Sequence, residues 1–163
     1  KLVKASRADV GIAFDGDGDR LIMVDHRGSV LDGDDILYII AQSRLRKLNG
    51  AVVGTVMSNL GLEHAIKKLE LDFFRAAVGD RYVMELLLKN NLILGGETSG
   101  HIINLELTTT GDGIITALQV LETIILTGKN LSDLTKEMSK YPQIMRNIKF
   151  DTQIDIMRND ENF

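Results

Sequence analysis

Short apolar runs alternate with amphipathic segments along most of this 163-residue chain. Runs rich in β-branched residues predict strands, and apolar residues that recur every three or four positions predict helices. Strands are predicted at 10–14, 20–25, 51–57, 72–78, 92–96, 101–107 and 144–150. Helices are predicted at 34–48, from Ser58 or Asn59 to about Leu69, at 80–90 and at 112–127, followed by a short helix capped by Ser132.

This alternation of strands and helices predicts an α/β fold, a three-layer sandwich in which helices flank a mixed, mostly parallel sheet. The two strands around the loop at 96–100 are expected to bring in the antiparallel pair. The segment before about Leu31 is expected to form a hairpin with no helix to cover it. The tail after about Phe150 is expected to join no core, and both ends look cut from something larger.

Composition narrows the class of protein. Hydrophobic residues make up 44% and charged residues 26% of the chain, which is typical of a globular protein. No apolar run approaches the ~20 residues of a membrane helix. The net charge of −4, with three Tyr, five Phe and no Trp, argues against a nucleic-acid partner. The lack of cysteine excludes disulfides and thiolate metal sites and fits a cytoplasmic protein.

The segment DGDGDR, residues 15–20, follows a predicted strand and alternates aspartate with glycine. Two carboxylates about 4 Å apart repel by ~4 kcal/mol at an effective dielectric near 20, so a cation is needed to gather several of them. Residues two apart in extended backbone point the same way, so Asp15, Asp17 and Asp19 can converge. Hard oxygen ligands suit Mg²⁺ or Ca²⁺. The sequence therefore predicts a divalent-cation loop, with Mg²⁺ favoured.

Other kinds of loop also contain closely spaced aspartates. An exposed acidic turn between two strands is the plain alternative. An EF-hand calcium loop is excluded because, counting Asp15 as position one, position six is Arg20 and position twelve is His26. An aspartyl-nucleophile phosphatase loop places threonine where this chain has Asp19.

A second candidate site is GGETSGH, residues 95–101, where Glu97 and Ser99 are again two apart and framed by glycines. A flexible loop that presents a carboxylate and a hydroxyl to one side can bind neighbouring sugar hydroxyls. His101 can donate to a phosphate or sugar oxygen, or move a proton near neutral pH. Taken alone, such a stretch is more often an ordinary glycine-rich hairpin, and a lone histidine such as His101 is more often a structural hydrogen-bonding residue than a catalyst.

Two further segments have weaker signals. In VGDRYVME, residues 78–85, the backbone N–H groups of a helix start suit an anion, but a helix cap with an Asp80–Arg81 surface pair explains the pattern as well. In TTTGDG, residues 108–113, Asp112 is favourable near the helix dipole, and the segment is expected to be a structural helix entry.

The motifs together resemble a known family. DGDGDR resembles the metal-binding loop of the α-D-phosphohexomutases, which interconvert hexose 6-phosphates and 1-phosphates. GGETSGH matches the family's sugar-binding signature GExSGH at every fixed position, and it follows the first motif in the expected order. VGDRYVME looks like a loop of the family's third domain. The resemblance runs from about Ala8 to Phe150.

The resemblance implies that Asp15, Asp17 and Asp19 hold Mg²⁺, with a phosphate oxygen of an active-site phosphoserine as the fourth partner. Arg20 would lie beside that phosphoryl group. The cation and the guanidinium would neutralise charge that develops on the transferring phosphoryl group, which is most of what such catalysis requires.

The resemblance also implies a sugar-binding role for the second loop, residues 95–101. Glu97 and Ser99 would contact two sugar hydroxyls and discriminate the orientation of the ring. His101 would bind near the transferring group as a general acid or base. Three residues of the 78–85 segment would line the substrate cleft: Gly79, Asp80 and Arg81.

Full-length members of the family have four domains, with the phosphoserine loop in the first and a phosphate-clamping loop in the fourth. No serine here lies in a Ser-His-Asn-Pro context, and no clamp-like stretch follows Lys149. The chain therefore resembles the end of domain 2 with the metal loop (1–30), domain 3 with the sugar loop (31–150) and a linker toward domain 4 (151–163). Its missing partners are domain 1, the rest of domain 2 and domain 4, and a homodimer of the parent is a further expected assembly.

The parent implied by the resemblance is an isomerase, a Mg²⁺-dependent intramolecular phosphotransferase that works through phosphoserine and a bisphosphate intermediate. VGDRYVME and YPQIMRNI favour the branch that converts glucosamine 6-phosphate to glucosamine 1-phosphate for bacterial cell-wall precursors. The alternatives are a branch acting on mannose or glucose phosphates, a non-catalytic cation- or sugar-binding module, and a metal-dependent phosphatase. The 163 residues alone are expected to bind Mg²⁺ weakly and to lack turnover.

Overall fold

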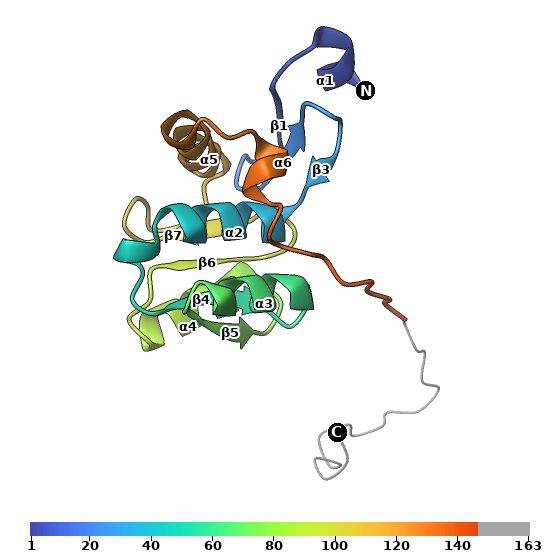
Figure 1. The fold of residues 1–163 in the computed structure, drawn as a ribbon. Coiled ribbons are helices and arrows are strands. Elements are labelled where there is room, and N and C mark those ends of the chain that lie inside the picture. Colours follow the sequence, from blue (N-terminus) through green and yellow to red (C-terminus); the bar gives the residue numbers. More distant parts are fainter. Residues whose placement is uncertain (147–163) are drawn as a thin grey trace.

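In the computed structural model, which describes residues 1–146, a central helix lies between two β-sheets (Figure 1). The elements in chain order are α1 (Leu2–Ser6), β1 (Val10–Phe14), β2 (Leu21–Asp25), β3 (Val30–Leu31), α2 (Gly33–Ser43), the 3₁₀ turn η1 (Leu45–Lys47), β4 (Ala51–Thr55), α3 (Leu60–Lys68), β5 (Asp72–Ala76), α4 (Asp80–Lys89), β6 (Leu94–Gly96), β7 (Ile102–Asn104), α5 (Gly113–Thr127) and α6 (Leu131–Leu134).

The larger sheet has the strand order β5-β4-β6-β7. Strand β4 pairs in parallel with both β5 and β6, and β7 pairs antiparallel with β6. The predicted mixed, mostly parallel sheet is therefore confirmed. The antiparallel strand enters through the loop at 97–101, as expected, because a short connection between adjacent strands reverses the chain.

Helices cover both faces of this sheet, which confirms the predicted three-layer sandwich. Side chains alternate between the two faces along a strand. Val52 of β4 packs into the core beneath α2 and α3, and the next residue, Val53, packs into a second core beneath α4. Both valines are fully buried.

Helix α2 begins with a reciprocal capping box, in which the Asp32 side chain accepts from the Asp34 and Asp35 N–H groups and the Asp35 side chain accepts from the Asp32 N–H. Residues Ile36–Ala41 of α2 are all at most 1% exposed. The helix is therefore buried on nearly every side, which explains why this part of its sequence is almost entirely apolar. The predicted helix at 34–48 ends earlier than expected, at Ser43, and the 3₁₀ turn η1 follows.

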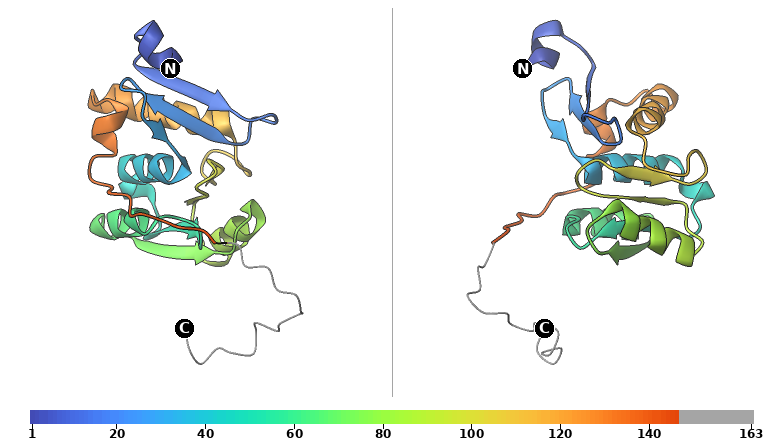
Figure 2. Two further views of the ribbon diagram at one scale, coloured as in Figure 1. Left: turned by 90° about the vertical axis from the view of Figure 1, so that its right-hand side faces the viewer. Right: turned by 180° about the vertical axis from the view of Figure 1, so that it is seen from behind.

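The smaller sheet, β1-β2-β3, is antiparallel throughout. The expectation that this amino-terminal hairpin has no covering helix is wrong. Leu21 and Met23 of β2 are fully buried, and β2 contacts α2, α5 and α6. Figures 1 and 2 both show α5 and this sheet on the side of α2 that faces away from the larger sheet. Two of the three covering helices lie about 90 residues or more further along the chain, so local pattern could not place them.

The carboxyl-terminal part differs from expectation in two ways. The cap of α6 is Asn130, whose side chain accepts from the Asp133 N–H at 3.0 Å, and not Ser132. No strand covers 144–146, the described part of the strand predicted at 144–150, and the rest of that strand and the tail lie outside the described residues. Among residues 1–146, no helix has the length and apolarity needed to cross a bilayer.

Candidate functional site

The acidic loop occupies the tip of the β1–β2 hairpin. Pairing of Phe14 with Leu21 closes the two strands and leaves residues 15–20 as the connection. Carboxylate oxygens of Asp15, Asp17 and Asp19 lie within 4.8 Å of one another. The three side chains therefore converge, as the alternation of aspartate and glycine suggested.

Arg20 partly neutralises this cluster. Its backbone N–H donates to Asp15 Oδ1 at 3.1 Å, and its Nε donates to Asp15 Oδ2 at 2.5 Å. Partial removal from water opposes ionisation of Asp15, but the Arg20 hydrogen bonds outweigh it and lower the Asp15 pKa to about 2. The hydrogen bond to Asp15 raises the Arg20 pKa in return. Arg20 Nε also lies 3.6 Å from Asp19 Oδ1. The Arg20 guanidinium is thus shared between Asp15 and Asp19.

His101 joins the acidic loop to the glycine-flanked loop. Its Nδ1 lies 3.0 Å from Asp19 Oδ2, and because a carboxylate only accepts, Nδ1 carries the proton. In the uncharged form of the imidazole, Nε2 is then an acceptor. Backbone contacts hold the same junction, through an Arg20–His101 bridge and a Leu21 N–H that donates to the Gly100 carbonyl at 3.1 Å.

Two glycines allow this close junction. Gly100 has φ +97°, and a Cβ there would collide with the Leu21 carbonyl oxygen. A Cβ at Gly111 would collide with the imidazole of His101. The His101 side chain is 7% exposed, so its ring is packed in place by its surroundings. A side chain at position 100 would push the two loops apart, and one at position 111 would displace the His101 ring.

Within residues 1–146, two buried atoms of this junction lack a hydrogen-bond partner: Asp19 Oδ1 and His101 Nε2. Buried polar atoms nearly always have a hydrogen-bond partner. Two such atoms without one therefore call for an explanation, such as a bound ion or ligand. Three hard carboxylate donors at one point suit a small divalent cation. The site's own chemistry therefore fits Mg²⁺.

The loop at 97–100 turns tightly and faces the acidic loop on one side. The Gly100 N–H donates to the Glu97 carbonyl at 3.0 Å. Ser99 is exposed and, with Asp15 and Arg20, borders a shallow hollow of about 260 Å³. The remaining residues of this hollow are Ala13, Phe14 and Ile22. Ser99 thus shares a surface with two residues of the acidic loop.

The segment at 79–81 is brought to this site only in part. The Gly79 N–H donates to Glu97 Oε1 at 2.9 Å, which ties the loop after β5 to the loop after β6. Asp80 accepts from the backbone N–H of Arg81 at 2.7 Å. The Arg81 side chain is 79% exposed and pairs with Glu85 along α4, so the alternative of an Asp80–Arg81 side-chain pair does not describe it.

Sequence reasoning left two residues of this region without a role, Asp34 and Thr98. Asp34 lies in the first turn of α2 and accepts a hydrogen bond from the Thr98 hydroxyl at 3.0 Å. Asp34 gives no distinctive signal in the sequence, because an acidic residue in a first helical turn is ordinary. Thr98 occupies the variable position of GExSGH, which carries no signal either.

Fold and site together define the class: an α/β sandwich whose carboxylate-rich loop is joined through a histidine to a glycine-flanked loop. The family described as phosphoglucomutase/phosphomannomutase, alpha/beta/alpha domain III, matches residues 32–141. The chain belongs to this family, the α-D-phosphohexomutases.

Individual relatives give the same result. The phosphoglucosamine mutase of Methylococcus capsulatus is 58% identical over 158 residues, which is 96% of this chain and 35% of that protein. The phosphoglucosamine mutase of Alkalilimnicola ehrlichii is 61% identical over 148 residues, 90% of this chain and 33% of that protein. The chain thus spans about a third of the length of these curated relatives.

A solved structure also matches. The phosphoglucomutase/phosphomannomutase family protein from Burkholderia thailandensis superposes with a TM-score of 0.75 at 26% identity, over 85% of this chain and 31% of that one. The arrangement of helices and strands around the two loops is therefore that of known phosphohexomutases.

Proposed function

We propose that this chain is the part of a Mg²⁺-dependent phosphoglucosamine mutase that carries its metal and sugar loops. The full-length parent would convert glucosamine 6-phosphate to glucosamine 1-phosphate. The names of the relatives at 58% and 61% identity support the substrate class. The observation that carries the proposal is the contact between His101 and Asp19, which places the two loops side by side.

Asp15, Asp17 and Asp19 would hold the Mg²⁺. The bound cation would supply positive charge to a phosphoryl group in transfer, the chief demand of this chemistry. The guanidinium of Arg20 is half exposed at the same point, so it can contact the phosphoryl oxygens as well. Phosphoryl transfer needs in addition a phosphoserine, which we assign to a part of the parent outside this chain.

The sugar would contact the 97–100 loop. Glu97 uses Oε1 to hold the Gly79 N–H, and in the described part of the chain its Oε2 has no hydrogen bond, so Oε2 can accept from a sugar hydroxyl. Ser99 is exposed beside Arg20 and can contact a neighbouring hydroxyl. His101, oriented by Asp19, is the candidate general acid or base, and its Nε2 lies buried beside Gly111. At the start of α4, the Gly79 N–H is held by Glu97 and the Arg81 N–H by Asp80, so the Asp80 N–H is the amide that would contact a distal anionic group of the substrate.

Two other functions differ in what they predict. A mutase for mannose or glucose phosphates would keep all of these contacts and differ only in which sugar turns over fastest. A non-catalytic binding module would keep the metal and sugar loops without turnover. Both alternatives can be separated from the proposal with one set of assays on the full-length parent.

The experiment measures mutase turnover by the full-length parent with glucosamine, mannose and glucose 6-phosphates. We expect glucosamine 6-phosphate to be preferred and Asp17→Asn to lower kcat by ~10³-fold or more, because the variant removes a ligand of the charge-stabilising cation. Asp72→Asn, an exposed carboxylate at the start of β5, is the matched control and should leave turnover unchanged. Equal kcat in the Asp17 and Asp72 variants, or no turnover in the unmodified parent, would overturn the proposal.

A further inference from the structure

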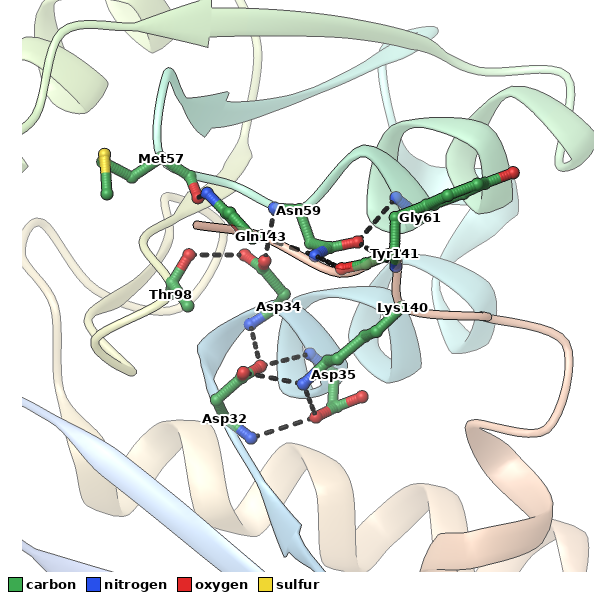
Figure 3. Close-up of polar contacts among 10 residues, drawn as sticks. All are labelled: Asp32, Asp34, Asp35, Met57, Asn59, Gly61, Thr98, Lys140, Tyr141 and Gln143. Atoms are coloured by element: carbon green, nitrogen blue, oxygen red, sulfur yellow. Dashed lines mark hydrogen bonds and ion pairs between the residues drawn. The ribbon is translucent and has the colours of Figure 1, made fainter. Parts of the chain in front are cut away.

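Asp34 is a buried carboxylate that the proposed chemistry does not use. It lies directly behind the proposed sugar loop, residues 97–100. Asp34 is 1% exposed, and each of its oxygens accepts a hydrogen bond from a different segment. Oδ1 accepts from the Thr98 hydroxyl at 3.0 Å, and Oδ2 accepts from the Asn59 N–H at 2.7 Å (Figure 3). Burial of a charged group is costly unless it is hydrogen-bonded, so this carboxylate is held by the two segments that it joins. Burial also raises the Asp34 pKa.

The Thr98 contact is one half of a two-point attachment. The Gly33 N–H donates to the Thr98 carbonyl at 3.0 Å, so both the backbone and the side chain of Thr98 are fixed to the first turn of α2. This approach is close enough that a Cβ at Gly33 would collide with the Glu97 carbonyl oxygen. The residue between the two proposed sugar ligands, Glu97 and Ser99, is therefore anchored to a rigid, buried helix.

The Asn59 contact continues the same connection to the strap, which we define as residues 139–143 after α6. The Asn59 side chain pairs with the strap backbone in both directions, because its Nδ2 donates to the Tyr141 carbonyl at 2.8 Å and its Oδ1 accepts from the Tyr141 N–H at 2.9 Å. Gln143 Nε2 adds a bond to the Met57 carbonyl at 3.1 Å.

Lys140 fixes the strap to the start of α2 as well. Its ammonium lies 2.6 Å from Asp32 and 2.5 Å from Asp35, the two residues of the capping box. Figure 3 shows these contacts and those of Asp34 on neighbouring residues of one helical turn. The strap, the start of α3 and the sugar loop thus meet at residues 32–35.

We propose that Asp34 is a positioning residue, which through Thr98 holds Glu97 and Ser99 in the geometry that binds the sugar and through Asn59 links that loop to the strap. This inference rests on the proposed function for the identity of the ligand. It assigns a role to position 98, which the family motif treats as variable. Loss of the Thr98 hydroxyl should loosen the loop and weaken sugar binding without removing any group that touches the substrate.

Amide hydrogen exchange of the 163-residue chain tests the attachment itself. Thr98→Val keeps the shape of the side chain and removes its hydroxyl, and Thr98→Ser keeps the hydroxyl. We expect Thr98→Val to speed exchange at the Gly33, Glu97 and Gly100 amides by about fivefold or more, the effect of losing one hydrogen bond. Exchange in Thr98→Ser should match the unmodified chain. Unchanged exchange in Thr98→Val would overturn the inference.

Kinetics of the full-length parent test the positioning role. We expect Thr98→Val to raise KM for glucosamine 6-phosphate by about fivefold to tenfold with kcat within about twofold, because ground-state and transition-state contacts to the sugar weaken together. Thr98→Ser should restore KM. Faster exchange with an unchanged KM would show a purely structural contact and overturn the inference. An unmodified parent without mutase activity would instead overturn the proposed function, and the exchange result would still decide the attachment.

Discussion

At the scale of single residues, acidic side chains in this protein differ by what surrounds them. Asp35 is 8% exposed, and burial raises its pKa to about 6 although hydrogen bonding and charge from Lys140 oppose the shift. The pKa of Asp15 is shifted in the opposite direction, downward, because Arg20 stabilises its charged form. The same residue type is therefore buried at a helix start in one place and paired with an arginine in an acidic loop in another.

The raised pKa of Asp35 predicts a pH-dependent stability. Between the unfolded pKa of 3.8 and the folded value of about 6, the folded state binds more protons, so the Asp35 contribution to the free energy of unfolding falls as pH rises. The total change is about 3 kcal/mol from about pH 4 to about pH 7. Urea unfolding over this range should show Asp35→Asn gaining stability relative to the unmodified chain as pH rises. Parallel curves for the two proteins would contradict this assignment.

At the scale of elements, the two loops of the site are joined by backbone geometry as much as by side chains. The β1–β2 hairpin meets the loop after β6 at the Leu21–Gly100 hydrogen bond, where only glycine tolerates both the φ of +97° and the close carbonyl. The joint between the smaller sheet and the sandwich therefore depends on a residue without a side chain.

A substitution at this joint should be costly. We expect Gly100→Ala to lower the free energy of unfolding by ~2 kcal/mol or more, from strained backbone and the collision with Leu21. Gly16→Ala is the matched control, because a Cβ there meets nothing within 4 Å. Urea denaturation of the two variants measures the difference. Equal unfolding midpoints would show that the joint adapts without cost.

The sequence pattern predicted most elements because their signals are local. Asn59 caps α3, and Gly128 ends α5 in the left-handed conformation, both within one turn of the expected boundary. Contacts between distant segments had no such signal. The His101–Asp19 pair joins residues 82 positions apart, and the helices that cover β2 come from the far end of the chain. The motifs indicated which residues belong to the site, whereas the attachment through Asp34 and Thr98 required coordinates.

At the scale of the whole molecule, the chain spans about a third of its curated relatives, and the proposed chemistry needs a phosphoserine from outside it. We therefore expect no mutase turnover from the 163 residues alone, measured as conversion of glucosamine 6-phosphate. Turnover by this chain comparable to that of the parent would contradict the division of roles.

Mg²⁺ binding by the 163-residue chain should also be weak, because the three carboxylates act without the fourth partner. Submicromolar affinity measured by calorimetry would contradict that expectation.

In the proposed function, Asp15, Asp17 and Asp19 share one divalent ion beside His101. Mn²⁺ can replace Mg²⁺ and broadens the NMR signals of nearby amides, so titration of the 163-residue chain with Mn²⁺ tests the claim most directly. We predict that the amides of residues 15–20 and of His101 broaden first, and that Asp17→Asn abolishes this effect while Asp72→Asn does not. Broadening spread evenly over the exposed acidic residues, or unchanged by Asp17→Asn, would contradict the account.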